Sequence, residues 1–116
     1  MCKDEFGDRM KGYESKERFD PSMPVIVRID GKRFSRWTSG LVKPFDARMI
    51  QLMTWVTERL VEKTSACIGY TQSDEITLVF YNDNLVGQIY ADGKVHKLVS
   101  ILSSMATAEF NSAVDF

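Results

Sequence analysis

Asp30 lies at the end of a predicted β-strand, where its carboxylate could bind a metal ion. Four of the five residues before it, 25–29, are β-branched and apolar, which predicts a short buried strand. Gly31 follows, and a glycine allows the backbone to approach a ligand closely. Lys32 and Arg33 come next and could hold a phosphate. A strand that ends in this order of residues suits a site for a metal ion and a phosphate group.

A second group of carboxylates lies in the turn 73–75, between two apolar runs that predict the arms of a β-hairpin, 66–70 and 76–81. If Asp30 and Asp74 meet at one edge of the sheet, their charges repel unless a cation lies between them. Magnesium suits that position, because it accepts one or two carboxylates and takes its other ligands from water and phosphate. Two such ions would support phosphoryl or nucleotidyl transfer.

Each stretch also has a purely structural interpretation. Asp-Gly is a common turn dipeptide, and Ser-Asp is ordinary hairpin chemistry. Asp46 is a good helix N-cap whatever else it does, and Glu75, at the start of a strand, can be an outward surface residue. Only the combination of two carboxylate-bearing turns on adjacent strands favours catalysis.

The elements that must position these residues follow from periodicity. We expect an amphipathic helix over 3–14 that packs on the flank of the domain, a connecting loop over 15–24, and the strand 25–30. A helix follows Asp46, then comes the hairpin, and a last helix covers 94–113. This order gives five of the six elements of the ferredoxin-like βαββαβ unit, an α+β fold whose final strand is missing. The open edge predicts association with another chain.

The composition predicts one domain that spans 1–116. Apolar residues make up 44% and charged residues 27%, and the formal net charge is −1, so no overall basic field indicates a nucleic-acid partner. Cys2 and Cys67 lack the spacing of a zinc site or a redox motif. We find no apolar leader and no run long enough to span a membrane, so we expect a cytoplasmic protein without a membrane partner.

The sequence resembles the N-terminal half of the tRNA-histidine guanylyltransferase family, which includes tRNA-repairing 3′-to-5′ polymerases. The matching motifs are residues 7–14, 27–34, 43–49, 51–53 and 70–75, with a looser match over 94–113. The Arg-x-Asp-Gly strand followed by the Gln-Ser-Asp-Glu turn is the most specific part. Ser35 departs from the pattern, since many members carry histidine there, and family members are longer than this chain.

The resemblance implies a palm domain that activates a tRNA 5′ end with ATP or GTP and then joins a nucleotide, usually GTP, through its 3′-hydroxyl. Carried over by position, Asp30, Asp74 and Glu75 are the catalytic carboxylates. Asp30, Asp74 and the Gly31 carbonyl would bind two Mg²⁺ ions, with Glu75 in support. The implied nucleotide-binding residues are Asp30, Gly31, Lys32, Arg33, Phe34, Ser35, Lys43, Asp46, Ser73 and Asp74.

Two other functions stay open on the sequence. The same palm could serve a nucleotide cyclase, which needs no tRNA. Alternatively, the chain could be a non-catalytic or partner-dependent module that binds GTP and magnesium or supports assembly. The incomplete sheet favours a homo-oligomer or a second chain that supplies the missing half.

Overall fold

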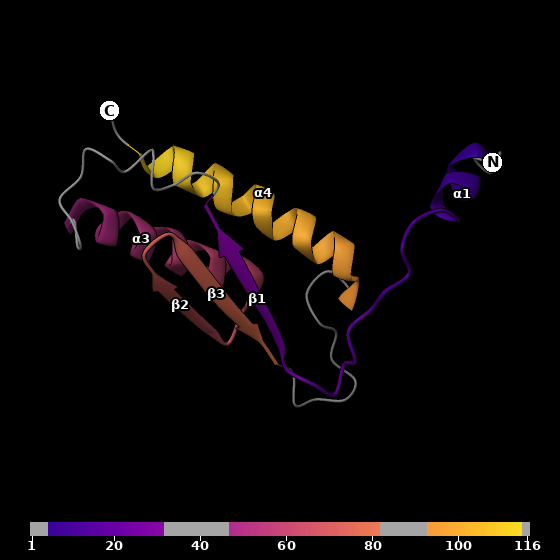
Figure 1. Ribbon diagram of the computed structural model, residues 1–116, viewed down its shortest axis with the longest axis horizontal. Helices are drawn as coiled ribbons and strands as arrows, with labels where there is room; N and C mark the ends of the chain where they lie inside the picture. The colour runs from indigo at the N-terminus through magenta and orange to yellow at the C-terminus, as the bar shows by residue number, and fades with distance from the viewer. Residues whose placement is uncertain (1–4, 32–46, 82–92, 115–116) are drawn as a thin grey trace.

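The computed structural model describes residues 5–31, 47–81 and 93–114 (Figure 1). Its elements are α1 (Glu5–Lys11), β1 (Val25–Asp30), α3 (Ala47–Thr64), β2 (Ile68–Gln72), β3 (Glu75–Phe80) and α4 (Val95–Ala113). Helices α3 and α4 lie together against one face of the sheet, with α3 on β2 and β3 and α4 on β1. None of the helices in the described ranges is long and apolar enough to cross a membrane.

The sheet has the order β1-β3-β2 among the described strands, and both pairings are antiparallel. Strands β1 and β2 therefore run in the same direction on either side of β3, and α3 makes the crossover between them. This is the arrangement that the βαββα order predicts, so the expected α+β fold is confirmed. The register pairs Asp30 with Glu75 across β1 and β3, and Gln72 with Glu75 across β2 and β3.

Strict alternation along β3 divides the sheet into two faces. Ile76, Leu78 and Phe80 are buried beneath the helices, whereas the residues between them are only half-buried. The core also contains Val25, Met53, Val56, Leu60, Ala66, Leu98, Leu102 and Ala106. Alternation places side chains of one parity on one face, so this strand holds Glu75 on the face away from the helices.

Helix α3 lies unusually close to β2. A Cβ atom built on Gly69 would come within 2.6 Å of Val61 Cγ2 and 2.8 Å of Thr57 Cγ2, so only glycine fits there without a shift. The helix ends at Thr64, and the next residue, Ser65, has a φ of 59° and donates its backbone N–H to the Val61 carbonyl at 2.9 Å. The chain therefore turns sharply at the end of α3 and enters β2, which packs closely against the same helix at Gly69.

A buried carboxylate joins the two helices. Glu109 of α4 is 7% exposed, and its carboxylate pairs with Lys63 of α3 and lies 3.9 Å from Arg59 Nε. The Arg59 guanidinium also lies over the Trp55 ring, 5.8 Å from its centroid. Burial of Glu109 is compensated by these cations, so the pairing fixes α4 against α3.

Two expectations from the sequence need correction. The first helix is shorter than expected and has no buried residue, so it does not pack on the flank of the domain; Figure 1 shows α1 apart from the sheet and its helices. Phe6 is 69% exposed and Tyr13 76% exposed, so the spacing predicted a shared face but not a partner for it. Strand β2 begins at Ile68, two residues later than expected, because Ser65 to Cys67 form the exit from α3.

The segment before β1 is a loop, as expected, and it touches the start of α4. Arg18 forms an isolated bridge with Lys94, the Phe19 N–H donates to the Gly93 carbonyl at 2.9 Å, and the Val95 N–H donates to the Glu17 carbonyl at 3.1 Å. These contacts fix the beginning of the last helix next to the entry to the sheet.

Candidate metal and nucleotide site

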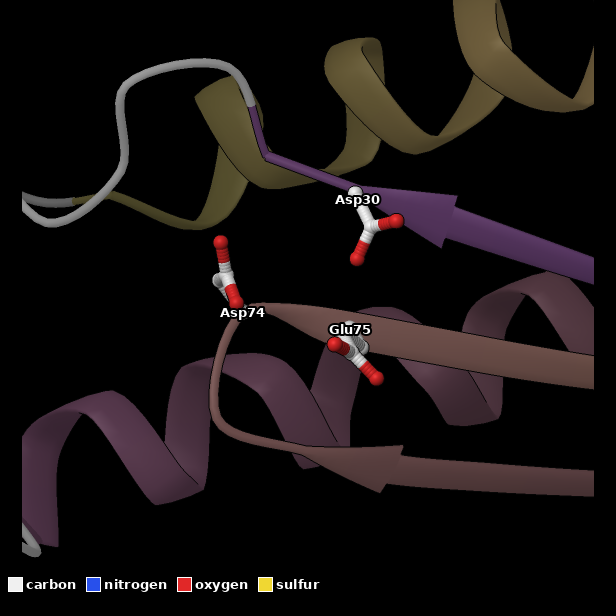
Figure 2. Close-up of side chains that lie close together, drawn as sticks. All are labelled: Asp30, Asp74 and Glu75. Carbon is white, nitrogen blue, oxygen red and sulfur yellow. The ribbon is translucent and has the colours of Figure 1, made fainter.

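Three carboxylates meet at one end of the sheet. Asp30 is the last residue of β1, Glu75 is the first residue of β3 and pairs with it, and Asp74 precedes Glu75 in the turn. One oxygen from each lies within 4.8 Å of the others (Figure 2). The antiparallel register therefore brings together residues that are far apart in the chain. The central expectation of the sequence analysis, that Asp30 and Asp74 come together, agrees with this geometry.

The turn that carries Asp74 is fixed by backbone contacts. Ser73, its first central residue, has a φ of 55°, a conformation that non-glycine residues rarely adopt. The Gly31 N–H donates to the Asp74 carbonyl at 3.3 Å, which ties the end of β1 to the turn. On β2, the Thr71 hydroxyl donates to the Glu75 carbonyl at 3.1 Å. Strain at Ser73 is retained because both neighbouring strands hold the turn in place.

Arg28 supplies a cation to the cluster. It lies two residues before Asp30 and so on the same face of β1, and its Nε is 3.3 Å from Asp30 Oδ2. Its Nη2 also donates to Glu75 Oε1. The side chains of Arg28 and Asp30 are 59% and 51% exposed, so solvent screens this contact. The guanidinium occupies carboxylate oxygens that a divalent cation would otherwise take.

We expect Arg28→Gln to strengthen the binding of Mg²⁺ to the nucleotide-free protein by about threefold. Removal of a neighbouring positive charge at an exposed site is worth roughly 0.2–1 kcal/mol, and it also frees carboxylate oxygens. Calorimetric titration with Mg²⁺ measures the change. Arg59→Gln is the matched control, because Arg59 is also an exposed arginine in ion pairs but lies on α3. Unchanged or weaker affinity in Arg28→Gln would show that the arginine does not compete with the cation.

A cavity of about 340 Å³ opens beside the cluster, between the end of the sheet and the two packed helices. Asp30, Gly31 and Asp74 belong to its lining. The apolar wall is formed by Ile29, Met53, Val56, Ile76, Ala106 and Phe110, and α4 adds the polar residues Thr107 and Asn111. A mostly apolar pocket with a few polar groups at its mouth is the usual form of a small-molecule site, and this volume falls within the usual range.

Not all of the predicted site residues can be placed. Asp30, Gly31, Ser73, Asp74 and Glu75 gather at this end of the sheet. The predicted nucleotide-binding residues Lys32, Arg33, Phe34, Ser35, Lys43 and Asp46 lie outside the described residues. Sequence reasoning missed the contribution of Arg28, although its spacing of two from Asp30 on a strand is a readable signal. It also missed Thr107 and Asn111, for which no local signal exists.

The donor set fits magnesium. All three clustered groups are carboxylates, which are hard oxygen ligands, and no histidine or cysteine belongs to the cluster. Because the site is half-exposed, water and phosphate oxygens can complete a coordination shell. Within the described residues, Asp30, Asp74 and Glu75 are the group that could hold such an ion.

Solved structures with the same fold indicate the class of protein. A bacterial tRNA(His) guanylyltransferase-like protein in complex with GTP has a TM-score of 0.87 and 40% identity, over 94% of this chain and 52% of that chain. The same kind of protein in complex with ATP gives 0.85 and 40%, over 92% and 49%. The fold and the carboxylate cluster thus define an α+β palm-type domain.

Sequence relatives give the family. The model of the tRNAHis guanylyltransferase family matches residues 7–115, and the chain belongs to this family. A protein of Acanthamoeba polyphaga mimivirus is 40% identical over 114 residues, which are 90% of this chain and 39% of that protein. The tRNA(His) guanylyltransferase of Schizosaccharomyces pombe is 32% identical over 113 residues, 95% of this chain and 41% of the enzyme. The chain thus spans about half the length of these relatives, or less.

Proposed function

We propose that the chain forms the palm of a magnesium-dependent nucleotidyltransferase that adds guanylate to the 5′ end of a tRNA, in the 3′-to-5′ direction. The observation that carries the proposal is the meeting of Asp30, Asp74 and Glu75 beside a cavity of about 340 Å³ that the two aspartates help to line. Relatives named tRNA(His) guanylyltransferase and neighbours solved with GTP and ATP support the reaction and the substrates.

The three carboxylates have different surroundings, and we assign them different roles. Asp30 and Asp74 line the cavity and would hold the metal ions, with the Gly31 carbonyl as a further ligand. Glu75 is paired with Arg28, as Asp30 is, but it does not line the cavity and would support the site. When bound, Mg²⁺ would supply charge stabilisation to the attacking and leaving oxygens. Asp30 and Asp74 would also determine where a triphosphate lies. The carboxylates repel the negative phosphates, so the triphosphate can approach them only through the bound cations.

The cavity would receive the base and ribose of the nucleotide. Its apolar wall suits the faces of a purine ring, and Thr107 and Asn111 offer hydrogen-bonding groups on α4. Since the carboxylates lie at the same opening, a nucleotide in the cavity would direct its phosphates towards them. We further propose Ser73 as a donor to the triphosphate, because the turn places it directly before Asp74.

Calorimetric titration of the chain with GTP, with and without Mg²⁺, tests this function. We expect magnesium-dependent binding that weakens at least about tenfold in Asp74→Ala, since loss even of a residue that only orients a metal ligand typically costs 10–100-fold. Asp8→Ala is the matched control, because Asp8 lies on the detached helix α1. Binding without magnesium dependence, or equal binding in Asp74→Ala, would contradict the assignment of the site.

A second candidate is a module that binds GTP and magnesium but needs a partner chain for the reaction. One observation favours it: among the described strands, β1 is an edge of the sheet, so its outer backbone groups can pair with another strand. Incorporation of labelled GTP into a 5′-truncated tRNA separates the two. Activity of the chain as a monomer would favour the enzyme, and activity only as an oligomer or with a second chain would favour the module.

A further inference from the structure

The face of the sheet opposite the helices is not covered by any described element. We call it the open face. Its residues form three rows across the strands: Ile26, Val79 and Ile68, then Arg28, Thr77 and Tyr70, and then Asp30, Glu75 and Gln72. Ile26 is 67% exposed, and Tyr70 is 58% exposed. The last row contains two of the three clustered carboxylates, so the open face continues directly from the candidate metal site.

Tyr70 presents an aromatic ring one row from that site. Its hydroxyl donates to Gln72 Oε1 at 3.1 Å, which holds the side chain towards the last row. Tyr70 lies one row and one strand from Glu75, and one row and two strands from Asp30. With rows about 7 Å apart and strands about 4.8 Å apart, these backbone separations are about 8 Å and about 12 Å. The shorter of these distances is close to the spacing of neighbouring nucleotides in an extended single-stranded RNA. A nucleotide next to one bound at the carboxylates would therefore reach the ring.

The charges on the open face determine how a nucleic acid can approach it. Asp30 and Glu75 repel phosphates, and Arg28 is already paired with both. An RNA strand that places its sugar-phosphate backbone against this surface would be repelled. An RNA strand that places its bases against the sheet and its phosphates towards solvent would avoid that repulsion. Stacking on an aromatic ring provides such a contact, because every base has a π face.

A protein partner fits this face less well. A protein interface would enclose the Arg28–Asp30–Glu75 group and remove it from water, and charged residues are depleted at the centres of such interfaces. Stacked bases leave the same charges hydrated. The middle row also combines an aromatic ring, a hydroxyl and a guanidinium. Proteins use these groups to bind single-stranded RNA.

We propose that Tyr70 is the stacking platform for an unpaired nucleotide of the RNA strand whose end reaches the carboxylate cluster. The proposal rests on the function proposed above and extends it from the reacting end to the neighbouring base. Tyr70 is a positioning residue here: it holds the RNA end and takes no part in the reaction.

Fluorescence anisotropy with a labelled, 5′-phosphorylated single-stranded RNA of mixed sequence tests the proposal on the full chain in the presence of Mg²⁺. We expect Tyr70→Ala to weaken RNA binding about tenfold, within the range that loss of one base–aromatic stack produces. Tyr70→Phe keeps the ring and should bind within about twofold of the original protein. Tyr81→Ala is the matched control, since Tyr81 is also exposed but follows the other end of β3.

GTP titration of the same variants separates this proposal from the proposed function. Tyr70→Ala should bind GTP and Mg²⁺ as the original chain does, whereas Asp74→Ala should not. If GTP binding is normal but the chain binds no RNA, or if Tyr70→Ala and Tyr81→Ala behave alike, the stacking role is wrong and the proposed function is untouched. A dimer in light scattering that Tyr70→Ala dissociates, without a change in RNA binding, would instead make the open face an interface between copies.

Discussion

Asp30→Asn is expected to lower the rate of guanylate addition about a thousandfold or more, and Glu75→Gln only about tenfold. Both changes remove one charge and keep the side-chain shape. Asp30 lines the cavity, so its loss would remove a metal ligand at the reacting phosphates. That loss is worth several kcal/mol of transition-state stabilisation, and 1.36 kcal/mol corresponds to a factor of ten. Glu75 shares the row and the Arg28 contact with Asp30, but it is not part of the cavity lining.

Initial rates of labelled GTP incorporation into a 5′-truncated tRNA, measured on the chain alone and with any second chain that it needs, give this difference. Thermal melting serves as the control, because both side chains lie near the surface and neither change should alter the fold. Partial recovery of Asp30→Asn at high Mg²⁺ would agree with a lost ligand. Equal effects of the two variants would mean that Glu75 also binds a metal, and the division of roles would then be wrong.

The local pattern was enough to predict the carboxylate-bearing elements. Four of the five residues from Val25 to Ile29 are β-branched and Asp30 ends the strand, and the limits predicted from the sequence are those of the structure. The hairpin was also predicted, because Ser73 and Asp74 separate two apolar runs. Once the strands pair as antiparallel neighbours, the meeting of Asp30 with Glu75 follows from the register. The site was therefore predictable to the extent that it depends on strand ends.

What could not be predicted depends on contacts between distant elements. The sequence predicts the start of β2 two residues too early because Ala66 and Cys67 are typical strand residues, whereas the left-handed Ser65 makes them part of the exit from α3. The cavity wall on α4 arises from packing of a helix that follows the site by about thirty residues in the chain. For α1, spacing identifies the residues that share a face but not whether anything covers it.

Leu78→Ala is expected to lower the free energy of unfolding by about 3–4 kcal/mol. Leu78 is fully buried at the centre of β3, the central strand of the sheet. Its neighbour across the ladder is Gly69, which has no side chain to fill the space. Val61 and Thr57, which contact that glycine position, are β-branched and stiff on their helix, so the cavity would persist.

Urea denaturation followed by circular dichroism gives the change in unfolding free energy. Val79→Ala, one residue further along the strand but on the open face, is the matched control and should cost less than about 1 kcal/mol. A domain of this size has a total stability of roughly 5–15 kcal/mol, so Leu78→Ala removes a large part of it. Because Leu78 lies on the core side and Glu75 on the open face, the folded variant should still bind GTP and Mg²⁺ below its denaturation midpoint. Loss of that binding while the fold persists would show that core packing, and not the strand register alone, sets the geometry of the carboxylates.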